Sequence, residues 1–364
     1  MKHFFQGLII SILLLFTGST KAPHNQPNTG YWALKGTIKT HIVKDKTDSL
    51  SGPEIFELQD NDGLPIWFGR QIYKDVCMSG VCKMIRLWVF WDGAGNYLGI
   101  QTLDKEPLTK SDHTLFEDTD YAKLNSILKD TASILRTLKQ EELIIVPDSI
   151  NPFEIDGYTA ATQPALAEVI VKDAVYTCHT LWHTVYGPSQ KNIENIITQR
   201  LSKEYLTAMF ETQKTAYVSW AIKTIEKNPV YHELFYKKIM EYIKSNDSSF
   251  SNQALDYFKP KLMKDVAIQH QFVELFAKVN INIKYEILWK YIEYGNTDEF
   301  VILNLLKIFN EQNMGIGTYN LILRLITPDH LRKNDDLFKI ITNMSNHENG
   351  YIRNLSRKLL ETSI

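Results

Sequence analysis

The pattern of apolar residues changes along this chain of 364 residues, and the change constrains the fold more than any other feature. Up to about residue 103 the apolar residues are aromatic or β-branched and stand in short runs between turn clusters, as is typical of strands. Beyond residue 188 they recur at helical spacing. We therefore predict an α+β domain, an antiparallel sheet with packed helices, followed by an all-α domain.

Five strands are expected in the first part, separated by turn clusters such as Asp92-Gly93-Ala94-Gly95-Asn96. The run Arg86-Leu87-Trp88-Val89-Phe90-Trp91 is apolar on both faces, so it should lie centrally in the sheet and be covered on both sides. The expected strands span residues 31–43, 54–58, 65–76, 82–91 and 97–103. Helices are expected at 118–128 and 133–143, and a short strand at 144–147.

The residue pattern beyond residue 188 predicts a series of short amphipathic helices. Breaks such as Asn228-Pro229, Gly295-Asn296 and Thr327-Pro328 interrupt them every one or two dozen residues. Helix pairs at that rhythm indicate a HEAT-like α-solenoid, in which each repeat buries its apolar face only against its neighbours. An irregular helical bundle is the alternative. The expected helices span 192–210, 215–226, 229–244, 251–258, 265–279, 284–294, 298–309, 319–326, 337–344 and 351–362.

The N-terminus has the pattern of a secretory signal peptide. Lys2 precedes an apolar run at 8–16, and small residues that suit cleavage follow up to Ala22. An uncleaved membrane anchor is the alternative. We therefore expect a periplasmic or otherwise exported protein. Its parts are a signal peptide at 1–22, a flexible tail at 23–30, the α+β domain at 31–188 and the helical domain at 189–364.

The overall charge shows no bias that would point to nucleic acid. With 40 basic and 42 acidic residues, the formal net charge is −2, and no basic run with interleaved aromatic residues occurs. We therefore expect no nucleic-acid partner. A hydrophobic content of 44% is enough for a large core in each of about two domains.

One stretch, residues 155–164, is the strongest chemical candidate. Asp156, Thr159 and Thr162 are spaced three apart, and Gln163-Pro164 then opens an apolar run at helical spacing up to Val185. A threonine ahead of such a helix can cap its free amide groups, and those amides together with the helix dipole can equally hold a phosphate. The cap is the plain structural interpretation of this stretch.

The pattern Asp-x-x-Thr-Ala-Ala-Thr resembles the covalent flavin site of the extracytoplasmic FMN-binding domain family, with Asp156, Thr159, Ala161 and Thr162 at the matching positions. Ala160 stands where that family usually has glycine. The resemblance implies that Thr162 carries FMN through a phosphoester bond made by a flavin transferase. It also implies an electron-transfer role with a redox protein as partner.

A polar loop at 108–113 offers two more candidate cofactor contacts. Lys110 can meet a phosphate, and His113 can meet the edge of a ring or move a proton. The alternative is a solvated loop between the sheet and the following helix.

The three cysteines suggest one disulfide and one buried thiol. Cys77 and Cys82 stand on the two sides of a short loop, so a disulfide between them suits an exported protein, and Cys178 is left over. A metal or haem site built from these cysteines and a histidine is the alternative. His179 and His183 lie four residues apart and can share a helix face as metal ligands; exposed or capped histidines are the alternative.

Two functional hypotheses follow from these patterns. In the first, an exported FMN-binding protein transfers electrons, and its helical domain docks a redox partner. In the second, the protein is a non-catalytic exported scaffold in which an α-solenoid binds a protein or peptide. Whether the chain is an enzyme stays open.

Overall fold

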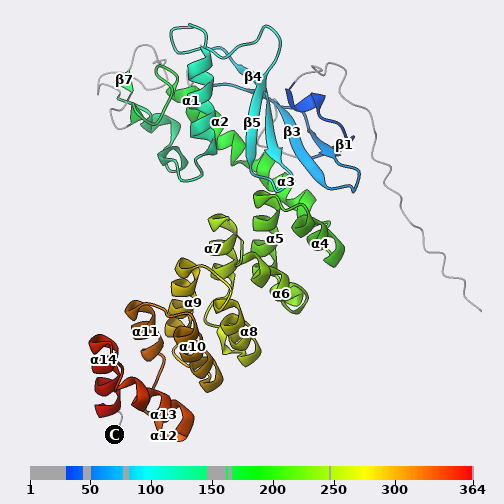
Figure 1. Cartoon of the computed structure of the whole chain (residues 1–364). Helices are drawn as coiled ribbons and strands as arrows, with labels where there is room; N and C mark the ends of the chain where they lie inside the picture. The colour runs from blue at the N-terminus through cyan, green and yellow to red at the C-terminus, as the bar shows by residue number, and fades with distance from the viewer. Residues whose placement is uncertain are drawn as a thin grey trace, which may run out of the picture. The chain divides into compact units, whose positions relative to one another are not determined.

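The computed structural model describes residues 30–43, 51–76, 82–145, 161–162, 166–245 and 247–362. The chain divides after Met209 into two compact units. The first contains a five-stranded antiparallel sheet with helices, and the second is helical throughout its described residues (Figure 1). The predicted order, an α+β part followed by an all-α part, is confirmed.

The sheet is a simple antiparallel meander in which each strand pairs with the next along the chain. Its central strands carry the apolar run, and every residue of β4 between Leu87 and Trp91 is buried. The prediction that this strand is covered on both sides is therefore confirmed. The strands are β1 (Thr37–Ile42), β2 (Glu54–Gln59), β3 (Pro65–Lys74), β4 (Ile85–Asp92) and β5 (Tyr97–Thr102).

The two faces of the sheet have different covers. Helices α2 (Val175–Val185) and α3 (Pro188–Thr198) pack on one face, where the indole Nε1 of Trp91 donates to the carbonyl of Val185 at 3.0 Å and Arg70 donates to Ser189 Oγ at 2.7 Å. Helix α1 (Asp118–Lys129) contacts both β5 and α2.

The other face is covered by a 3-10 turn, η1 (Gly30–Ala33), whose Trp32 side chain enters an aromatic cluster. The first predicted strand therefore begins later than expected, because residues 30–33 coil over the sheet instead of joining it. We call this surface the aromatic face. It comprises Phe56, Leu58, Trp67, Trp88 and Phe90.

The predicted helix at 133–143 is wrong, and the reason lies in long-range hydrogen bonds. The segment forms two 3-10 turns, η2 (Ile134–Arg136) and η3 (Gln140–Glu142). The carbonyl oxygens of Leu135 and Leu138, which an α-helix would use for its own bonds, accept instead from the imidazoles of His183 and His179.

The predicted helix start at Gln163-Pro164 is also wrong. Helix α2 begins only at Val175, and Thr162 lies in a short strand, β7 (Ala161–Thr162), opposite Ile144 of β6 (Ile144–Ile145). Asp173 has a φ of +58°, a left-handed conformation that stops a helix from extending back through it. Thr162 therefore does not cap this helix.

The first unit extends further along the chain than residue 188. Helix α3 contacts the sheet through the hydrogen bond from Arg70 to Ser189, and the expected helix at 192–210 is interrupted between α3 and α4 (Lys203–Glu211). Arg200 occupies the interruption and reaches the buried carboxylate of Glu57 on β2. This bond holds the segment to the sheet, and the compact first unit extends to Met209, beyond the predicted boundary at 188/189. The predicted domain bounds stay a prediction.

The second unit is a stack of helix pairs in two rows. Helices α5, α7, α9, α11 and α14 contact one another in that order, and α8 contacts α10 in the second row. Of the two alternatives, this nearest-neighbour pattern matches the α-solenoid. The helices are α5 (Thr215–Lys227), α6 (His232–Tyr242), α7 (Ser248–Tyr257), α8 (Val266–Phe276), α9 (Ile281–Tyr294), α10 (Glu299–Glu311), α11 (Ile316–Leu323), α12 (Pro328–Lys333), α13 (Asp335–Met344) and α14 (Gly350–Glu361).

The predicted signal peptide and tail, at 1–22 and 23–30, lie outside the described residues except for Gly30. Among the residues that the structure describes, no helix is long and apolar enough to span a bilayer. Export of the chain stays a prediction.

Candidate functional site

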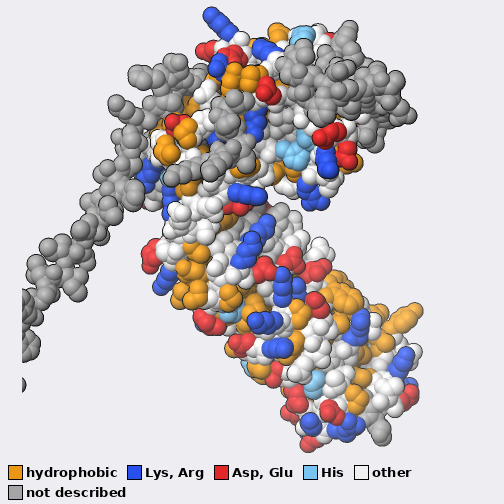
Figure 2. Space-filling view, turned by 180° about the vertical axis from the view of Figure 1, so that it is seen from behind, with side chains coloured by type: hydrophobic (Ala, Val, Ile, Leu, Met, Phe, Trp, Pro, Cys, Tyr) orange, Lys and Arg blue, Asp and Glu red, His pale blue; other side chains and the backbone are white. Residues whose placement is uncertain are grey.

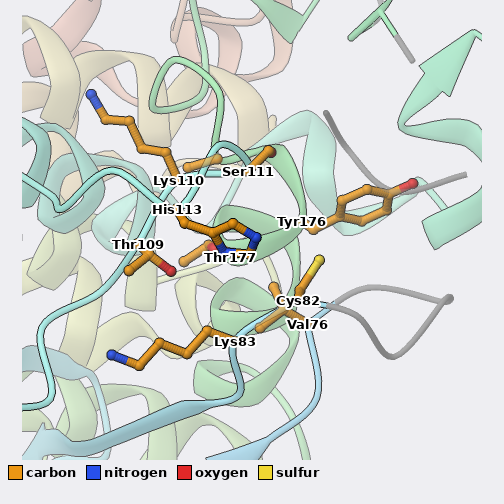
Figure 3. Close-up of a pocket in the computed structure, with 10 residues that line it drawn as sticks. Val76, Cys82, Lys83, Thr109, Lys110, Ser111, His113, Tyr176 and Thr177 are labelled. Carbon is orange, nitrogen blue, oxygen red and sulfur yellow. The ribbon is translucent and has the colours of Figure 1, made fainter. Parts of the chain in front are cut away.

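Three residues that the sequence singled out in two different segments meet in one pocket beside the first turn of α2 (Figure 3). Lys110, His113 and Cys82 all line it. The cavity measures about 20 Å³, which is room for about one water-sized group. The other lining residues are Val76, Lys83, Thr109, Ser111, Ala174, Tyr176 and Thr177.

Backbone hydrogen bonds fix the loop that carries Lys110 and His113. The amide of Lys110 donates to the carbonyl of Thr114 at 2.8 Å, and His113 takes a φ of +65° to close the turn. Both the amide and the hydroxyl of Ser111 donate to the carbonyl of Asp173, at 2.7 and 2.8 Å. The loop is therefore tied to the residues that immediately precede α2.

The two lysines of this pocket differ in how available their charges are. The ammonium group of Lys110 lies 2.9 Å from the carboxylate of Asp120, and this hydrogen bond raises the pKa of Lys110. Lys83 is exposed and forms no ion pair with any residue that the structure describes. Lys83, which the sequence analysis did not select, is therefore the cation best placed to meet an anion here.

One disulfide-bonded cysteine and one buried free thiol are described, as the sequence predicted. Cys82 is disulfide-bonded, while Cys77, its predicted partner, lies outside the described residues. Cys178 is a free, buried thiol whose Sγ accepts from the amide of Val171, and burial raises its pKa to about 12. A thiol held in its protonated form in this way is a poor nucleophile and metal ligand.

The histidine pair on α2 serves the packing of the first unit. His179 donates to Leu138 O at 2.9 Å and His183 donates to Leu135 O at 3.0 Å, so one ring nitrogen of each is already used. Burial lowers the pKa of His179 and favours its neutral form. Within the described part of the chain, no group of three or more potential metal-ligating side chains comes together.

The residues of the flavin-like motif are described only in part. Asp156 and Thr159 lie outside the described residues, and of Ala161 and Thr162 only the backbone in β7 is described. The covalent attachment of FMN to Thr162 stays a prediction.

The most strongly perturbed carboxylate of the first unit is Glu57, which the sequence analysis missed. Its side chain is fully buried and accepts two hydrogen bonds from Arg200, at 2.5 and 2.6 Å, one from His41 and one from Gln59, each at 2.7 Å. Burial alone would raise its pKa, but these bonds outweigh it and lower the pKa to about 2. These hydrogen bonds join two strands of the sheet to Arg200, which lies between α3 and α4. We therefore infer that Glu57 stabilises the first unit.

The second unit carries three open grooves, each between two helices that are not consecutive in the chain. They lie between α6 and α8, between α7 and α9, and between α10 and α13, with volumes of about 360, 310 and 520 Å³. Figure 2 shows charged and hydrophobic side chains interspersed over the surface of this unit. Sequence reasoning missed these grooves because each is lined by residues some thirty positions apart.

No protein-family model, curated protein or solved structure matches this chain. We therefore derive its function from the pocket beside α2 and the grooves of the helical unit.

Proposed function

We propose that this chain is an exported binding protein whose helical unit holds an extended segment of a partner protein in the grooves between its helices. The observation that carries the proposal is the recurrence of similar grooves along the stack. Each has an apolar floor, such as Met240 with Leu275 or Leu303 with Ile340, and charged or amide side chains on its walls. An apolar centre with a polar rim is the usual composition of a protein-binding surface.

Exposed large apolar side chains on the same helices support this proposal. Leu234 on α6, Trp289 on α9, Phe300 on α10 and Phe338 on α13 have exposed fractions between 42 and 52%. Of these four, Trp289 lines a groove, and tryptophan is among the residue types that most often contribute a large share of the binding free energy. The helical unit therefore offers both grooves and anchor side chains.

Selection from a displayed library of random linear peptides, with the intact chain as bait, tests the proposal. We expect enriched peptides that bind with dissociation constants of about 1–100 µM and that cross-link to residues between 210 and 364. The double variant Leu303→Asp/Ile340→Asp should lose those peptides that cross-link to α10 or α13. A library from which no sequence is enriched over an unrelated bait protein would overturn the proposal.

As a second candidate function we propose FMN binding and electron transfer, with the flavin covalently bound to Thr162. The pocket beside α2 favours it, because a cation and several hydroxyl groups line one small space: Lys83, Thr109, Ser111 and Thr177. Such donors suit a phosphate group. FMN would supply the redox chemistry, the helical unit would dock a redox protein, and a flavin transferase would make the bond.

Replacing Thr162 by alanine should abolish a covalent flavin label without unfolding the protein, because the acceptor oxygen is removed while the strand β7 retains its backbone. The chain is produced in an exporting host together with a flavin transferase. Fluorescence of the band on a denaturing gel and the mass of the peptide containing Thr162 are then measured. Thr198→Ala is the control, since Thr198 is an exposed threonine of the same unit that does not line the pocket, and it should keep the label. Label retained on Thr162→Ala would refute the attachment.

A further inference from the structure

The groove between α7 and α9 differs in charge from the other two. Three acidic residues and one basic residue line it: Asp256, Glu286, Glu293 and Lys290. The α6/α8 groove has two acidic and three basic residues, Glu241, Glu274, Lys237, Lys244 and Lys278. The α10/α13 groove has one acidic and two basic residues, Asp336, Lys307 and Lys339. Only the α7/α9 groove, of these three, has an excess of negative charge.

Two carboxylates of this groove are free to meet a partner. Glu286 and Glu293 are exposed and form no ion pair with any residue in the described part of the chain. Asp256 lies 3.8 Å from the ammonium group of Lys290, but its side chain is 81% exposed, so this pair adds little stability and can be exchanged. No ion pair within the described residues therefore neutralises Glu286 or Glu293.

Trp289 gives the groove an apolar anchor between these carboxylates. Its side chain is 46% exposed, and the guanidinium group of Arg324 lies 4.8 Å from the centre of its ring. This cation–π contact holds the indole in one orientation before a partner binds. Binding then loses less side-chain entropy at Trp289. Residues 286, 289 and 293 are three and four positions apart, so Glu286, Trp289 and Glu293 follow one another on one face of α9.

The spacing of the two glutamates matches an extended peptide. Seven residues of α-helix advance about 10.5 Å. Three residues of a polyproline II segment complete one turn and advance about 9.3 Å, so side chains three positions apart stand on the same side of it. In a β-strand, side chains three positions apart point to opposite sides. A polyproline II segment that runs along α9 would therefore place side chains three positions apart opposite Glu286 and Glu293, with the residues between them near Trp289.

We infer that the α7/α9 groove binds a basic segment of a partner protein in the polyproline II conformation, in which two arginines or lysines stand three positions apart with an apolar residue between them. The inference rests on the proposed function and specifies the partner of this one groove. The basic side chains form charge-assisted hydrogen bonds with Glu286 and Glu293. The apolar residue packs on Trp289, and Leu255 lies at the floor.

Fluorescence anisotropy with the full chain tests the inference. The probe is a fluorescein-labelled peptide of about a dozen residues that contains Arg-Leu-Gly-Arg. We expect micromolar binding that weakens several-fold between about 50 and 300 mM salt. Glu286→Gln/Glu293→Gln should raise the dissociation constant about tenfold, and Trp289→Ala by a similar factor. The matched control Glu241→Gln/Glu274→Gln changes charge equally in the α6/α8 groove and should stay within about twofold of the unaltered chain.

The outcomes separate this inference from the proposed function. Equal weakening by both double variants would mean non-specific attraction and would overturn the inference. The inference would also be overturned if the basic peptide did not bind while library-selected peptides still bound other grooves. That result would leave the proposed function intact. If neither the basic peptide nor any selected peptide binds, both are overturned. Far-ultraviolet circular dichroism of each variant confirms that its helices remain folded.

Discussion

Replacing Arg200 by methionine should lower the free energy of unfolding of the first unit by about 3–5 kcal/mol. The substitution removes the two hydrogen bonds from the guanidinium group and leaves the carboxylate of Glu57 buried without its main counter-charge. It also releases the segment between α3 and α4 from the sheet. Urea unfolding followed by the fluorescence of the sheet tryptophans measures the loss.

Arg86→Met is the matched control, because Arg86 pairs with Glu106 at 3.0 Å but the side chains are 45% and 34% exposed, whereas Glu57 is fully buried. Its cost should be below about 1 kcal/mol. Adding Glu57→Gln to Arg200→Met should recover part of the loss, since the uncompensated charge disappears. Equal costs for Arg200→Met and Arg86→Met would contradict the role of the buried pair.

The same cluster should make the first unit sensitive to acid. Because the pKa of Glu57 is lowered to about 2 in the folded protein, its stabilising effect is complete above the unfolded pKa of about 4.3 and is lost as pH falls toward 2. Between pH 6 and pH 3 the unaltered protein should therefore lose more stability than Glu57→Gln, which has no proton to take up at this position. Urea midpoints at the two pH values measure the difference.

Replacing Trp32 by alanine should cost the first unit about 3–5 kcal/mol, because a large buried side chain leaves a cavity in the aromatic face. Its ring centre lies 4.9 Å from those of both Trp67 and Trp88, in edge-to-face arrangements that add to the burial. Leu34→Ala is the control in the same segment, since Leu34 is 49% exposed and should cost less than about 1 kcal/mol. Urea unfolding monitored by circular dichroism compares the two.

If Trp32→Ala cost no more than Leu34→Ala, the turn η1 would not be part of the core. Trp32→Phe should be intermediate, because the phenyl ring keeps most of the aromatic contacts while part of the volume is lost. The indole nitrogen of Trp32 has no hydrogen-bond partner within the described structure, so the effect reports packing and not a lost hydrogen bond.

The helix at Asp118–Lys129 and the five strands were predictable because their signals are local. Acidic residues in the first turn mark the start of α1, and turn clusters such as 92–96 mark the strand ends. The breaks between the last helices are equally local, as at Gly295, which has a φ of +76° at the end of α9. Such signals act within a few residues, so a single sequence contains them.

The candidate sites were predictable only in their parts. Lys110, His113 and Cys82 were recognised as reactive residue types, but their meeting with Lys83 in one pocket depends on the turn that ties Ser111 to Asp173. The grooves of the helical unit depend on helices about thirty residues apart in the chain coming side by side. Neither the meeting of the pocket residues nor the pairing of the helices can be predicted from the local pattern of residues.

The sequence by itself determined the order of strands and helices, the central position of β4 and the all-α character of the second unit. Only the tertiary structure decided where α2 begins, why 133–143 is not a helix, and where the charge of Glu57 is compensated. At these positions, hydrogen bonds between residues far apart in the chain outweigh the conformational preference of the local sequence. The carbonyls of Leu135 and Leu138 bind histidines of α2, and Glu57 binds Arg200 far along the chain. A hydrogen bond between distant residues forms only after packing has brought both partners together.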